Sequence, residues 1–96
     1  MDYRDVLEEV QSTGRDAEEI LREKLPKVAA RFERLDKAIA KLLADVQKEF
    51  PDATYYTSGG DGFALLLGPS HDEHSRPLQD LAACHGLHAR IDGGDW

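Results

Sequence analysis

The chain has 96 residues, of which 41% are hydrophobic and 32% are charged, and its net charge is −7 at pH 7. This composition is typical of one small globular domain and excludes a disordered or fibrous chain. No apolar run approaches the roughly 20 residues of a membrane span. The first residues lack the basic start and apolar stretch of a signal peptide. A single cysteine, Cys84, excludes an intramolecular disulfide, so we expect a cytoplasmic protein.

The negative charge is concentrated in residues 1–14 and 51–96, and the segment between them is slightly basic. Phosphate contacts need clustered cations, so this distribution disfavours nucleic acid as a ligand. An acidic surface instead predicts a protein partner with a basic surface, although charge of this size also simply keeps a small protein soluble. The candidate partner-binding residues are Asp61, Asp72, Glu73, Asp92, Asp95 and Trp96.

The first half of the chain is predicted to be helical. Residues 2–11 place apolar side chains at three- and four-residue spacing, which predicts a short first helix. A second helix is expected to begin at Thr13 or Asp16, because each is followed three residues later by an acid that can complete a capping box. We expect this helix to continue as one long amphipathic helix over residues 15–50, kinked or tightly broken near Pro26.

Beyond Pro26, apolar residues alternate at spacings of four and three, which is a heptad seam. β-Branched residues at position a, here Ile39 and Val46, with leucine at position d, here Leu35 and Leu42, are typical of parallel two-stranded coiled coils, so the seam predicts a homodimer. Additional apolar residues beside the seam widen the stripe, as in a helix that packs inside its own globule, and an intramolecular bundle is therefore the alternative. The seam residues are Val28, Phe32, Leu35, Ile39, Leu42 and Val46.

The second half changes character after Pro51. Residues 53–57 and 63–67 are rich in strand formers and flank a glycine-rich turn, which predicts a β-hairpin. A proline near its start and a glycine after its end predict a short helix from Pro77 to His85, and residues 88–91 are expected to form a third short strand.

The predicted fold class is therefore α+β in a single domain, residues 1–96. Residues 2–50 form the helical part with the heptad seam. Residues 53–96 form a small β-β-α-β part with an antiparallel sheet.

A histidine- and cysteine-bearing segment supports a metal-binding alternative. His71, His74, Cys84 and His88 could supply four ligands to a tetrahedral zinc ion, although their spacing departs from the usual closed zinc sites. We expect no other cofactor and no catalytic residue. Cys84 is predicted to lie in the middle of the short helix, where a buried thiol is inert.

The chain is small and acidic, places helices before a hairpin, and ends in Arg90-Ile91-Asp92-Gly93-Gly94-Asp95-Trp96. In its size, charge and order of elements it resembles the small accessory proteins encoded by bacterial viruses. The resemblance implies a protein that binds and inhibits or regulates a bacterial protein complex, and it carries over no residue roles. The predicted function is thus a small acidic, non-enzymatic, homodimeric protein-binding module. The alternatives are a zinc-binding protein and a purely structural helical oligomerisation domain.

Overall fold

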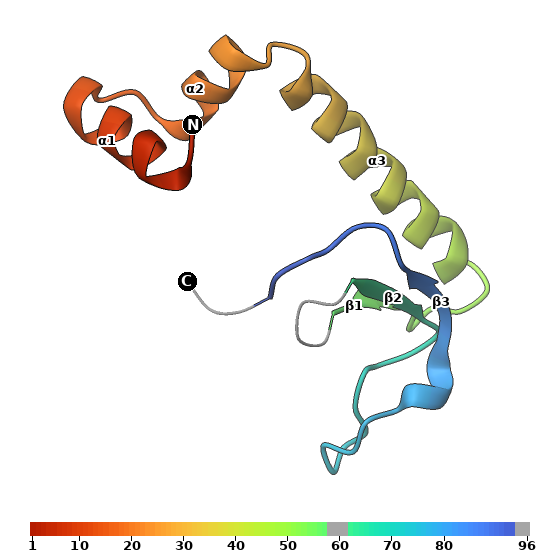
Figure 1. Ribbon diagram of the computed structural model, residues 1–96. Helices are drawn as coiled ribbons and strands as arrows, with labels where there is room; N and C mark the ends of the chain where they lie inside the picture. Colours follow the sequence, from red (N-terminus) through yellow and green to blue (C-terminus); the bar gives the residue numbers. More distant parts are fainter. Residues whose placement is uncertain (58–61, 94–96) are drawn as a thin grey trace. The chain divides into compact units, whose positions relative to one another are not determined.

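The computed structural model describes residues 1–57 and 62–93 and confirms the α+β class (Figure 1). Over these ranges, three helices precede a three-stranded antiparallel sheet and a short 3-10 turn. The chain divides into two compact units, Met1–Ile39 and Ala40–Trp96, so each unit is described by itself. Helix α3 (Val28–Gln47) contributes residues to both.

In the first unit, α1 (Tyr3–Thr13) and α2 (Ala17–Lys24) each begin with a capping box. The N-cap carboxylates, Asp2 and Asp16, accept hydrogen bonds from the backbone N–H three residues further on, and an acid at that position accepts from the N-cap N–H. Each cap satisfies backbone donors that a helix leaves open at its first turn, and is worth about 1 kcal/mol. The predicted start of a helix at Asp16 is confirmed.

Arg15 joins the two short helices. Its guanidinium lies 3.4 Å from the Glu9 carboxylate on α1, forms an ion pair with Glu23 on α2 and donates to the backbone oxygen of Glu19 at 3.2 Å. The hydrogen bond to Glu23 raises the pKa of Arg15 further above its already high value. Ile20 is buried, so this hairpin rests on one apolar side chain and one branched ion-pair network.

The predicted interruption near Pro26 is confirmed as a break between α2 and α3. Leu25 still donates its N–H to the oxygen of Leu21 at 2.8 Å, but its backbone has left the helical conformation (φ −137°, ψ 75°). A residue before proline avoids the helical conformation, because the proline ring clashes with its backbone. The N–H of Val28 then bonds to the oxygen of Leu25 at 3.1 Å, which closes a tight junction.

The second unit contains the sheet, with strand order β1-β2-β3. Strands β1 (Thr54–Tyr56) and β2 (Phe63–Leu66) form the predicted hairpin, with Tyr55 opposite Leu65. Its predicted glycine-rich turn lies for the most part outside the described residues. The amide of Gln47, at the end of α3, donates to the backbone oxygen of Ala53 at 3.0 Å and ties the helix end to the start of the hairpin.

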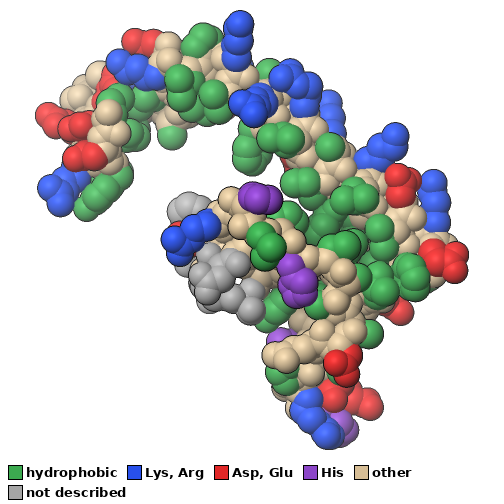
Figure 2. All heavy atoms as spheres, turned by 45° about the vertical axis from the view of Figure 1, so that its right-hand side comes forward, with side chains coloured by type: hydrophobic (Ala, Val, Ile, Leu, Met, Phe, Trp, Pro, Cys, Tyr) green, Lys and Arg blue, Asp and Glu red, His purple; other side chains and the backbone are tan. Residues whose placement is uncertain are grey.

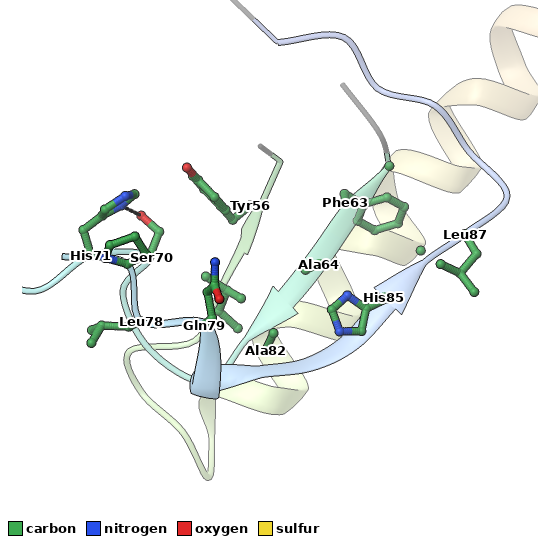
Figure 3. Close-up of a pocket in the computed structure, with 14 residues that line it drawn as sticks. Tyr56, Phe63, Ala64, Ser70, His71, Leu78, Gln79, Ala82, His85 and Leu87 are labelled. Carbon is green, nitrogen blue, oxygen red and sulfur yellow. Dashed lines mark hydrogen bonds between the residues drawn. The ribbon is translucent and has the colours of Figure 1, made fainter. Parts of the chain in front are cut away.

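The core of this unit is small. Ala53, Leu65 and Leu66 are buried. Neighbouring residues on a strand point to opposite faces, so both faces of β2 are covered there, as its wholly apolar sequence predicts. Leu43 and Val46, on the last turns of α3, are half-buried, and Figure 3 shows this end of the helix behind the sheet.

The short helix predicted for residues 77–85 is wrong in extent and type. Only the 3-10 turn η1 (Gln79–Leu81) forms, and β3 (Ala82–Gly86) follows it directly. The third strand therefore lies at residues 82–86, not at 88–91. Pairing with β2 accounts for the difference, because it fills hydrogen-bonding positions along one edge of β2 that a helix would leave open.

Two residues take on different roles as a result. Cys84 is exposed on a strand instead of buried within a helix. Gly86 does not end a helix; it lies opposite Phe63, whose ring packs against it so closely that a side chain at this position would collide with the ring.

Candidate interaction surface

The apolar seam runs along one face of α3, a 20-residue helix of about 30 Å that contains neither glycine nor proline. Most of it is exposed: the exposed fractions are 72% for Phe32, 56% for Leu35 and 52% for Leu42, and Val28 and Ile39 also exceed one third. Figure 2 shows hydrophobic side chains along one side of α3 and Lys and Arg side chains along the other. The spacing that predicted the seam therefore corresponds to an exposed stripe.

The opposite side of α3 is a solvated helix face. There, Lys37 lies 3.3 Å from Glu33, one helical turn earlier. Near the end of the helix, Asp45, which flanks the seam, lies 3.4 Å from Lys48 in the turn after α3. These side chains are largely exposed, and such pairs contribute only a few tenths of a kcal/mol. The mixed signs give no continuous cationic stripe for a nucleic acid backbone.

Three of the acidic candidates lie in the described part of the chain. Glu73 and Asp92 are exposed. Asp72 is half-buried and organises its own loop: its carboxylate accepts from the N–H groups of His74 and Arg76, and it lies 3.6 Å from the Arg76 guanidinium. The remaining candidates, Asp61, Asp95 and Trp96, lie outside the described residues.

The proposed zinc ligands are not brought together. Over residues 1–57 and 62–93, no group of three or more His, Cys, Asp or Glu side chains is arranged to hold a metal ion. His71 begins a loop that returns at Pro77, His74 lies at the tip of that loop, Cys84 is on β3 and His88 follows the strand. The departure of their spacing from the usual closed zinc sites is thus matched by ligands that lie on a loop, on a strand and beyond that strand.

A hollow of about 630 Å³ lies on one face of the sheet, and sequence reasoning missed it (Figure 3). Its floor consists of small residues, Ala64 on β2 and Ala82 on β3, which occupy positions on the same face. Tyr56 and His71 border one end of the hollow. Their rings pack edge to face, with the ring centroids 6.1 Å apart. The two alanines, one on each strand, are the sequence signal for such a space, and only the strand register shows that they share a face.

Ser70 and His71, which both border this hollow, are hydrogen-bonded to each other, with the serine Oγ 3.0 Å from the histidine Nδ1. Nucleophilic catalysis needs a base that is itself oriented by a third group. In the described part of the chain, no carboxylate is hydrogen-bonded to His71, and the imidazole is exposed. The pair therefore gives no support to an enzyme.

Comparisons with known proteins assign no family: no protein-family model, curated protein or solved structure matches the chain. In the described ranges, every helix is too short or too polar to cross a membrane. The exposed apolar stripe on α3 is therefore the feature on which the proposed function is based.

Proposed function

We propose that this protein is a small acidic, non-enzymatic protein-binding module that associates through the apolar seam of α3 and forms a coiled-coil homodimer. The supporting observation is the exposure of Phe32, Leu35 and Leu42 at heptad spacing on a continuous helix. Isolated exposed leucines are ordinary on protein surfaces, but a contiguous apolar stripe marks an interaction site.

The free energy that the seam can gain by burial favours a dimer whose formation depends on concentration. Fully burying an aliphatic or aromatic side chain contributes roughly 1.5–3 kcal/mol. Applied to the exposed fractions of Val28, Phe32, Leu35 and Leu42 in two copies, this gives roughly 10 kcal/mol. Loss of translational and rotational freedom costs about 4–15 kcal/mol. The two values are of the same size, so we expect a reversible dimer rather than a permanent one.

We further propose that the dimer acts in the cytoplasm and binds a larger partner with a basic surface, in the manner of a viral accessory protein that inhibits or regulates a bacterial complex. The net charge of −7 and the exposed carboxylates of Glu73 and Asp92 support this part of the proposal. Charge complementarity of this kind mainly accelerates association and weakens with salt.

Sedimentation equilibrium on matched variants tests the seam. Leu35→Lys places a charge in the seam, whereas Ala44→Lys places the same charge on an exposed position outside it. Lysine is nearly as good a helix former as leucine and alanine, so α3 is retained in both variants. We expect Leu35→Lys to raise the dimer dissociation constant about 100-fold or more, and Ala44→Lys to change it less than about threefold. Equal effects of the two variants would contradict the proposal.

A further inference from the structure

We infer that the partner on the α3 seam is a second copy of this chain that lies parallel and in register. This rests on the proposed function and adds the orientation, which the apolar residues alone leave open. In a parallel dimer, each seam residue meets its own copy. In an antiparallel dimer the same six residues also pair fully, because Val28 would meet Val46, Phe32 would meet Leu42 and Leu35 would meet Ile39 of the second copy.

The residues that flank the seam favour the parallel arrangement. With Phe32 at position a, Arg31 is at g and Asp36 is at the following e, the two positions that face each other across a parallel dimer. Both side chains are exposed, and neither forms an ion pair within the described part of its own chain. Two such pairs would form, one on each side of the seam.

The antiparallel arrangement forms less favourable charge pairs across the interface. There, Asp36 would face Asp36 of the second copy, which places like charges together at the centre of the interface. Arg31 would face Asp45, but the carboxylate of Asp45 already lies 3.4 Å from the ammonium group of Lys48, just after the end of α3 in the same chain. The parallel orientation thus gains two new opposite-charge pairs and avoids one repulsive contact. The order of residues in the seam agrees, with Ile39 and Val46 at a and Leu35 and Leu42 at d.

Engineered cysteines distinguish the two orientations. In a Cys84→Ser background, Val28→Cys and Val46→Cys are prepared separately and oxidised mildly, alone and mixed. A disulfide needs Cα atoms no more than about 7 Å apart. In a parallel dimer each variant forms a disulfide with its own copy. In an antiparallel dimer residue 28 lies about 27 Å from residue 28 of the second copy, so neither variant links alone and only the mixture does.

Exchanging the charges of Arg31 and Asp36 tests the orientation independently, through the dimer dissociation constant at low salt. Arg31→Asp and Asp36→Arg, made singly, should each raise the dimer dissociation constant about three- to tenfold, and the double variant should restore it. In an antiparallel dimer, the double variant would not recover, because the acid introduced at position 31 would face the carboxylate of Asp45. A dimer whose cysteines link only in the mixture would overturn the parallel orientation and leave the proposed function intact. A chain that stays monomeric in sedimentation would overturn both.

Discussion

Gly86 is the position at which a single added methyl group tests the sheet most directly. A Cβ atom there would lie 2.7 Å from Cδ1 and 2.9 Å from Cζ of Phe63, and nearer still to Cε1. Carbon atoms pack best at about 3.5–4.0 Å, so the ring must move by about 1 Å. Overpacking of this kind costs roughly 1–3 kcal/mol. The ring of Phe63 borders the open hollow and can turn partly into it, which favours the lower half of that range.

A smaller contribution to the free energy of unfolding comes from the unfolded chain, and it opposes the cost of the collision with the ring. Among the described glycines, only Gly14 and Gly62 have positive φ, so alanine is compatible with the backbone at Gly86. Alanine at such a site stabilises by about 0.4–1 kcal/mol, because it restricts the unfolded chain. We therefore expect Gly86→Ala to lower the free energy of unfolding by about 1 kcal/mol in the natural sequence and to raise it by about 0.5 kcal/mol in a Phe63→Ala background.

The assay is urea unfolding at one protein concentration, followed by near-ultraviolet circular dichroism, to which the edge-to-face pair of Tyr55 and Phe63 contributes. Four proteins complete a double-mutant cycle: the natural sequence, each single variant and the double variant. The reversal of sign between backgrounds is the diagnostic result. If Gly86→Ala has the same effect with and without the Phe63 ring, the packing of that ring over β3 is incorrect.

Three further predictions concern the caps, the sheet and the thiol. Asp2→Ala and Asp16→Ala should each cost about 1 kcal/mol and reduce the far-ultraviolet helix signal, whereas unchanged helicity would show that the capping boxes are dispensable. Burial raises the pKa of Tyr55, so the folded protein holds this proton more tightly, and the free energy of unfolding should fall as pH rises above about 10. Tyr55→Phe should flatten that fall, and an unchanged alkaline slope would refute the effect. Cys84 should react with a thiol-specific disulfide reagent in the folded protein nearly as fast as in urea, whereas protection until unfolding would restore the buried thiol expected from the sequence.

The features predicted correctly from the sequence depend on neighbours in the chain. Asp16 and the acid three residues later form a cap within one helical turn, and the strain before Pro26 acts on the residue next to it. The hairpin follows in the same way from two strand-forming runs on either side of a short turn. The seam residues are likewise fixed by spacing along one helix, so their shared face was predictable.

The features that were missed depend on partners distant in the chain. Residues 77–86 have the proline, leucine and alanine spacing of a short helix, but Cys84 pairs with Leu65 across the sheet, and these long-range hydrogen bonds override local preference. Cys84 lies on β3 and not in a helix, and the predicted zinc ligands are not clustered in the described residues. The hollow depends on Ala64 and Ala82 occupying one face, which only the observed register determines.

The central claim is that the exposed seam of α3 makes this protein self-associate. Sedimentation equilibrium of the unmodified chain, from low to high micromolar concentration, tests it most directly. We predict a reversible transition from the mass of one chain to that of two, because the apolar gain and the cost of association are of similar size. A single species with the mass of one chain across the whole range would contradict the account.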